Sequence, residues 1–239
     1  MSSRSFEKPA AKKIIPAMLA DTDFLFRQAK LGSDAFTQAQ PFPHLLLPSF
    51  IKPACCFALF EGLTIEGLEL EGSGMEGMLS LVGQSLVHES IVRMLLWELS
   101  SSTLIRHFTS LAGKPPLLPD PFLIHSGVQH FAQQEIVHRA EKEYFARHPE
   151  TQLQNVLRVE LFASSEAHAT FTIDVMDTPG HVGVSHTATN GAVWFVNSDD
   201  YYLRYRFEHP AQWRSLMAYY YINDNARNLH GEEQPDAGY

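Results

Sequence analysis

The sequence predicts an α+β fold in which a double-stranded β-helix, or jelly roll, is buttressed by helices from the N-terminal half. Apolar residues recur at helical spacing before Pro119, whereas short β-branched and aromatic runs bounded by turn residues follow it. Several short strands in succession are typical of an antiparallel sandwich or barrel. The 239 residues contain no internal linker of distinct composition, so residues 1–239 are expected to form a single domain.

The N-terminal part of this domain, residues 14–118, is predicted to be mostly helical support. A first helix is expected over residues 17–30, where apolar and polar side chains are mixed. Pro41 to Phe50 predicts a short buried strand. Pro53 then begins a helix that runs through Leu63, because proline costs little in a first turn, where its missing N–H is not needed. Two further helical runs lie within Leu86 to Ala112, joined by serines that can cap the second.

The C-terminal part, residues 119–222, is predicted to form the jelly-roll core. Its expected strands are six short runs rich in β-branched and aromatic residues: Phe122–Ile124, Leu157–Phe162, Ala169–Met176, Ala192–Val196, Tyr201–Phe207 and Leu216–Ile222. The ends of the chain are predicted to be mobile tails. Residues 1–13 are basic, and residues 226–239 are rich in Gly, Glu, Asp and Pro, so neither favours a packed structure.

Composition and charge limit the classes of partner. With 45% hydrophobic and 19% charged residues, the chain can bury a sizeable core. The formal net charge is −9, whereas a nucleic-acid backbone is bound by clustered Lys and Arg, so we expect no nucleic-acid partner. The sequence has no run of about 18 apolar residues, the length that spans a bilayer, and we expect no membrane interaction.

The cysteines and the start of the chain predict a cytoplasmic protein. The two cysteines, Cys55 and Cys56, are neighbours, and adjacent cysteines rarely close a disulfide, which favours a reducing compartment. The first residues, Met1 to Lys8, lack the apolar stretch of a signal peptide. Both observations point to a cytoplasmic location.

Four segments occur in one order along the chain: Pro41–Leu47, Leu117–Pro121, Arg147–Thr151 and Arg214–Tyr221. In that order and at those spacings they resemble the prolyl-4-hydroxylase-like branch of the iron(II)/2-oxoglutarate oxygenases. The resemblance extends over most of the chain. It implies a jelly-roll fold in which a His-x-Asp pair and a later histidine bind Fe(II) on one face, leaving the other face for 2-oxoglutarate and O2.

At the positions that this resemblance assigns to the iron ligands, the standard residues are absent. Counting back from the third segment without a gap places Lys142 and Tyr144 at the His-x-Asp pair. Starting instead from the nearest upstream histidine gives His138, with Ala140 where the aspartate is expected. The distal histidine corresponds to Leu203, and leucine cannot bind a metal. We therefore expect no metal at the standard three-ligand site, with His138 as the only candidate remnant.

The expected anchor for the co-substrate is Arg214. The resemblance implies that an Arg or Lys near the start of the last core strand binds the distal carboxylate of 2-oxoglutarate, and a guanidinium suits that task because it can bind a carboxylate through two hydrogen bonds. Arg214 is then expected to face the barrel interior. The alternative is a structural arginine that pairs with an acidic neighbour. The resemblance implies Fe(II) and 2-oxoglutarate as cofactors, whereas the substituted ligand positions argue against the iron.

Histidines on or near predicted strands leave a relocated metal site open: His125, His130, His138, His181 and His186. A hairpin would bring His181 and His186 together, whereas the alternative is that all five are loop or surface residues. Nucleophilic catalysis has less support, because the sequence has no Gly-x-Ser-x-Gly motif and the apolar helix around the two cysteines disfavours a thiolate.

The leading hypothesis is an oxygenase-like protein whose standard iron site is lost, acting as a ligand-binding protein or as an enzyme with non-standard chemistry. A second is an active Fe(II)/2-oxoglutarate-dependent hydroxylase with relocated metal ligands. A third is a non-catalytic partner subunit of an active relative. The expected partners are a small-molecule carboxylate or a peptide, and the expected assembly is a homo- or hetero-dimer. The substrate stays open, because specificity depends on the site rather than on the fold.

Overall fold

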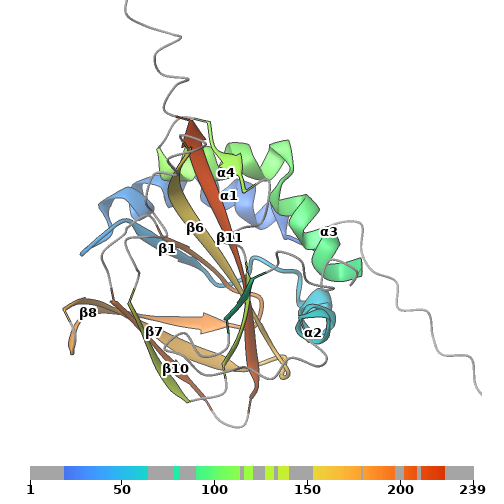
Figure 1. The fold of residues 1–239 in the computed structure, drawn as a ribbon, viewed down its shortest axis with the longest axis vertical. Coiled ribbons are helices and arrows are strands. Elements are labelled where there is room, and N and C mark those ends of the chain that lie inside the picture. The colour runs from blue at the N-terminus through green and yellow to red at the C-terminus, as the bar shows by residue number, and fades with distance from the viewer. Residues whose placement is uncertain are drawn as a thin grey trace, which may run out of the picture.

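Two antiparallel sheets face each other, and helices cover the outer face of the larger one (Figure 1). The computed structural model describes residues 19–63, 78–80, 90–113, 116–120, 127–131, 134–139, 153–178, 180–196, 202–208 and 211–223. The expected tails, at residues 1–13 and 226–239, and the expected strand Phe122–Ile124 lie outside these ranges. Within the described ranges, no helix is long and apolar enough to cross a membrane.

The larger sheet has the strand order β1-β9-β6-β11-β4-β2, and β3 pairs with β11 outside this path. Its strands are β1 (His44–Leu47), β2 (Met78–Ser80), β3 (Leu118–Pro119), β4 (Gly127–Phe131), β6 (Leu153–Ser164), β9 (Val193–Val196) and β11 (Trp213–Asn223). The smaller sheet has the order β5-β10-β7-β8. Its strands are β5 (Glu135–Arg139), β7 (Thr170–Thr178), β8 (His181–Thr189) and β10 (Tyr202–Phe207).

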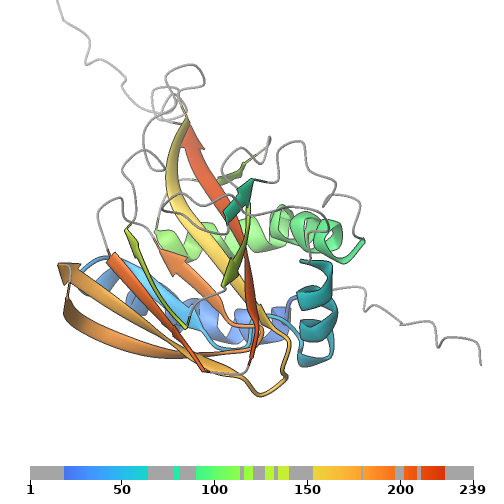
Figure 2. The same ribbon diagram turned by 60° about the horizontal axis from the view of Figure 1, so that its bottom comes forward.

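From β4 onward the chain passes repeatedly between the two sheets, and only the β7–β8 hairpin stays within one of them. This connectivity is typical of a jelly roll (Figure 2). The predicted α+β fold with a jelly-roll core is therefore confirmed. Five of the six predicted runs coincide with β6, β7, β9, β10 and β11. The sequence did not predict β4, β5 or β8, because polar residues interrupt their apolar pattern.

Four helices pack beside the larger sheet: α1 (Thr22–Gln38), α2 (Pro53–Gly62), α3 (Ser90–Leu99) and α4 (Ser102–Ala112). Local signals set their ends. Asp21 accepts a hydrogen bond from the Phe24 N–H at the start of α1, and Ser101 does the same for the Leu104 N–H in α4. Gly113 ends α4 with a φ of 59°, a conformation that glycine adopts without strain.

The first helix lies further along the chain than residues 17–30. Glu98 accepts hydrogen bonds from the backbone N–H groups of Leu19 and Ala20, and Ala20 forms an isolated bridge with Ile51. These contacts hold residues 19–20 in an extended conformation, so α1 starts only after them. Tertiary hydrogen bonds here override the weak helical pattern of the sequence.

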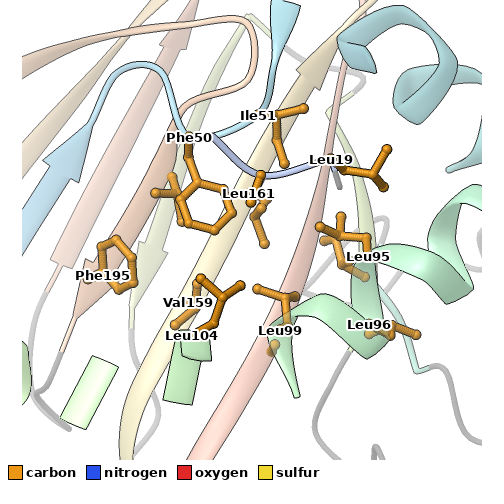
Figure 3. Close-up of a cluster of buried hydrophobic side chains, with 14 of the residues drawn as sticks. Leu19, Phe50, Ile51, Leu95, Leu96, Leu99, Leu104, Val159, Leu161 and Phe195 are labelled. Carbon is orange, nitrogen blue, oxygen red and sulfur yellow. The ribbon is translucent and has the colours of Figure 1, made fainter. Parts of the chain in front are cut away.

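The space between the helices and the larger sheet is filled by a hydrophobic core that is mostly aliphatic. Val159 and Leu161 of β6 and Phe195 of β9 face Leu95, Leu99 and Leu104 of the helices, as Figure 3 shows. Alternate residues of β6 and β11 contribute to this core, because successive side chains of a strand point to opposite faces. The residues between them therefore point into the space between the two sheets, which is where a jelly-roll ligand site is expected.

Candidate functional site

The interior between the two sheets is filled largely by aromatic side chains. Phe131 lies 4.6 Å from Phe207 and Phe171 lies 4.6 Å from Trp213, measured between ring centroids. Phe162 packs against Phe171 at 4.7 Å. These residues come from both sheets, so the rings join the two layers across the middle of the barrel. All five are less than a tenth exposed.

A buried polar network lies among these rings. Arg158 and Glu160 are two residues apart on β6, which puts both side chains on the interior face. Arg158 Nη2 donates to Glu160 Oε2 at 2.8 Å, and Tyr205 OH donates to the same oxygen at 3.0 Å. Ser215 Oγ donates to Glu160 Oε1 at 2.7 Å. The Glu160 carboxylate, with 0% residual exposure, is therefore bound by donors from β6, β10 and β11.

The network has the composition of a carboxylate-binding site. A guanidinium, a phenol and a hydroxyl converge on one carboxylate, and its charge is balanced by Arg158. A buried ion pair is tolerated only when both charges are partnered, because each ion loses its hydration on burial. The carboxylate that these donors bind belongs to the protein itself.

Leu203 lies at the position that the resemblance assigns to the distal iron ligand. It is fully buried in the interior cluster, and in the sheet its Cα partners are His138 and Val175. His138, the candidate remnant, is thus directly across from Leu203 in the backbone register. Ala140, Lys142 and Tyr144 lie outside the described residues.

Of the positions expected to bind iron, the structure describes the side chain of Leu203 alone. Nowhere in the described ranges do three or more His, Cys, Asp or Glu side chains gather where they could hold an ion. At the expected distal position the interior offers an aliphatic side chain, which has no lone pair for Fe(II).

Arg214 points away from the interior. Its Nη1 donates to the backbone oxygen of Phe60 at 2.6 Å, and its guanidinium carbon lies 4.0 Å from the centroid of the Phe60 ring. Its neighbours Trp213 and Ser215 face the interior, so Arg214 faces α2 on the opposite side of β11. Burial lowers the pKa of this guanidinium from its ordinary value. The prediction that Arg214 faces the barrel interior is therefore wrong, and its role in binding a 2-oxoglutarate carboxylate stays a prediction that this placement does not favour.

An offset of one residue in the register of β11 explains why Arg214 was predicted to face the interior. A strand has a side-chain period of two, so moving a motif by one position transfers the side chain to the other face of the sheet. The sequence motif locates the strand correctly but does not fix its register. Arg158, on the neighbouring strand β6, is the guanidinium that the structure places in the interior.

The histidines are distributed differently from the expectation. His181 and His186 are not brought together by a hairpin, because both lie on β8. His181 is exposed, and its Nδ1 lies 2.8 Å from Asp177 Oδ1. His130 Nε2 lies 2.9 Å from the backbone oxygen of Leu63. His125 lies outside the described residues.

His186 has a different partner, His44 of β1, which the sequence analysis did not single out. The two Nε2 atoms are 3.0 Å apart, although 142 residues separate them along the chain. Burial lowers the pKa of both imidazoles, and the neighbouring ring lowers that of His44 further. No local sequence signal connects the two, since the contact arises only when β1 of one sheet meets β8 of the other.

Comparison with known proteins supports the fold. No family model matches the chain, and no curated protein matches it. Among solved structures, a prolyl 4-hydroxylase from Phytophthora capsici is similar with a TM-score of 0.56 and 11% identity, covering 95% of this chain and 74% of that one.

Two further similar structures are non-heme alpha-ketoglutarate-dependent enzymes of nogalamycin biosynthesis. The carbocyclase SnoK has a TM-score of 0.51 and 14% identity, covering 87% of this chain and 93% of that one. The epimerase SnoN has a TM-score of 0.51 and 13% identity, covering 85% of this chain and 82% of that one. At this level of identity the similarity shows a shared fold, that of the 2-oxoglutarate/Fe(II) oxygenases including the prolyl 4-hydroxylases.

Proposed function

We propose that this protein, which has the fold of the 2-oxoglutarate/Fe(II) oxygenases, acts as a binding protein and does not carry out their reaction through the standard iron site. One observation carries the proposal: the carboxylate-binding donors of the interior are occupied by the protein's own Glu160. We infer that this internal carboxylate uses the donors that an acidic co-substrate entering the interior would otherwise bind.

The energetics of the network support this interpretation. A dicarboxylate that entered the interior would have to displace Glu160 from Arg158, leaving a second buried anion without its cation. Breaking a buried pair by removing one partner costs about 3–5 kcal/mol. The surrounding side chains are mostly apolar, so a displaced carboxylate would find few new hydrogen-bond donors among them. We therefore expect 2-oxoglutarate to be excluded from this interior.

The ligand positions support the same conclusion. Leu203 fills the expected distal position with an apolar side chain, so an iron at the standard site would lack one of its three protein ligands. The proposal therefore requires no step that passes through Fe(II).

The first experiment adds Fe(II) and 2-oxoglutarate to the full chain under nitrogen. We expect no visible charge-transfer band and no conversion of 2-oxoglutarate to succinate after oxygen is admitted. A band that disappears in His138→Ala would overturn the proposal and establish the active hydroxylase with relocated ligands. A silent protein that purifies with an active oxygenase would identify the binding partner as a catalytic relative.

The second experiment tests whether Glu160 occupies a carboxylate-binding site formed by the interior donors. Glu160→Ala removes the internal carboxylate and leaves space beside Arg158, so acetate or formate should raise the melting temperature of this variant and not that of wild type. Glu160→Gln is the matched control, because its amide fills the same space. Equal responses in all three proteins would show that the donors do not form a carboxylate site.

A further inference from the structure

Outside the interior network, the two sheets are joined at one edge by a pair of imidazoles. His44 is the first residue of β1 in the larger sheet, and His186 lies on β8 in the smaller sheet. Their Nε2 atoms are 3.0 Å apart, and the ring planes meet at 78°. The rings therefore do not stack, and the two nitrogens face each other.

The orientation of His44 is fixed by the backbone. Its Nδ1 lies 2.8 Å from the carbonyl oxygen of Phe42, which can only accept, so Nδ1 carries the hydrogen and donates. This tautomer leaves Nε2 of His44 without a hydrogen, 3.0 Å from Nε2 of His186. Histidines that bind metals commonly have this arrangement, with the second ring nitrogen donating to a backbone carbonyl.

The surroundings keep both rings in the form that binds metals. Only 3% of His44 is exposed, whereas His186 is partly exposed and gives the pair an opening to solvent. Trp194 lies 5.0 Å from the His44 ring and 5.5 Å from the His186 ring, between centroids. Burial lowers the pKa of both imidazoles, which favours the neutral form, and a neutral imidazole has a free lone pair.

We propose that His44 and His186 form a two-histidine site for a divalent first-row transition ion, of which Zn²⁺ and Ni²⁺ are the simplest probes. Two nitrogens that each bind one ion at about 2.1 Å lie about 3.0–3.4 Å apart for octahedral to tetrahedral angles. The distance of 3.0 Å falls in that range. Without an ion, His186 Nε2–H donates to His44 Nε2. With one, His186 would carry its hydrogen on Nδ1, and the two rings would turn so that both Nε2 lone pairs converge on the ion.

The site differs in place and in composition from the standard iron site. His186 lies on the edge strand of the smaller sheet, whereas Leu203 and His138 lie on β10 and β5, at the other side of β7. Imidazole suits Zn²⁺, Ni²⁺ and Cu²⁺ better than Mg²⁺ or Ca²⁺, which prefer oxygen. Water would fill the remaining coordination positions from the partly exposed side of His186. The ion would therefore link β1 to β8 and hold the two sheets together at this edge.

The test uses the untagged full chain, freed of metal with a chelator and then titrated with ZnCl2 or NiCl2. We expect a rise in melting temperature for wild type and a dissociation constant at least about tenfold weaker in His186→Ala. His181→Ala is the matched control: it removes an exposed histidine of the same strand and should leave the metal response unchanged.

His186→Ala also loses the hydrogen bond to His44, which by itself can lower the melting temperature. The comparison therefore uses the change in melting temperature on adding metal, measured separately for each protein. Because His44 is buried, the second readout uses wild type: Co²⁺ should give d–d absorption that excess Zn²⁺ abolishes. Equal metal responses in wild type and His186→Ala, or no response in wild type, would overturn the site. Neither result bears on the charge-transfer experiment, so the two proposals fail independently.

Discussion

The two faces of the larger sheet differ in chemistry although they share the same strands. The face toward the helices is almost wholly apolar, with Val159, Leu161 and Leu216 packed against aliphatic helix residues. The face toward the smaller sheet carries aromatic rings and the buried pair of Arg158 and Glu160. The helix face acts as scaffold, whereas the inner face holds the buried charged groups on which the proposed function rests.

The largest effect is expected from removing one partner of the inner network. Glu160→Ala leaves Arg158 buried without its counter-ion and should lower the free energy of unfolding by about 3–5 kcal/mol, measured by urea denaturation. The double variant Arg158→Met/Glu160→Ala should lose clearly less than the sum of the two single variants. Additive losses would show that the two side chains do not act as a pair.

On the helix face, a cavity should lower the free energy of unfolding by a comparable amount, without any effect of charge. Leu161→Ala removes a fully buried side chain from the aliphatic core and should cost about 2–5 kcal/mol, because the surroundings can collapse only in part. This loss should not depend on added carboxylate, unlike that of Glu160→Ala. Stabilisation of Leu161→Ala by acetate would contradict the prediction that only the inner face binds a carboxylate.

A smaller effect is expected for Arg214→Met. This change removes the hydrogen bond to the Phe60 oxygen and the contact with its ring, and should cost about 1 kcal/mol. Because Arg214 faces α2, its loss should not alter the response to 2-oxoglutarate, succinate or citrate. A carboxylate that stabilises wild type but not Arg214→Met would return this residue to the role of anion anchor.

The smallest effect concerns the outer face of the smaller sheet, where Asp174 binds Arg204, Arg206 and Ser185. Burial raises the pKa of Asp174, but the hydrogen bonds from these three residues outweigh it and the net pKa is lowered. A carboxyl with a lowered folded pKa stabilises the protein above its unfolded pKa of about 3.9, and this contribution is lost as pH falls through the folded pKa. The stability difference between wild type and Asp174→Asn should therefore shrink in acid. A difference that stays constant from pH 7 to pH 3 would contradict it.

Much of the architecture could be predicted because it depends on local periodicity. The change from helical to strand spacing near Pro119 placed five of the jelly-roll strands, and proline and serine signals placed the starts of α2 and α4. β8 was not predicted, because the partly exposed residues of this edge strand lack a clear apolar alternation. The prediction that Leu203 replaces the distal ligand came from the sequence alone and stays a prediction, since it depends on the register of the resemblance.

By itself, the sequence determined which residue types are available. Position 203 is a leucine rather than a histidine, and Arg158 and Glu160 are two positions apart, which puts them on one face of a strand. Only the tertiary structure decided where these side chains point. It turned Arg214 toward α2, because strand register is fixed by packing across the sheet and a shift of one residue reverses the face. It also brought His44 to His186 and Tyr205 to Glu160. Contacts between residues so distant along the chain are set by the stacking of two sheets, which no local pattern encodes.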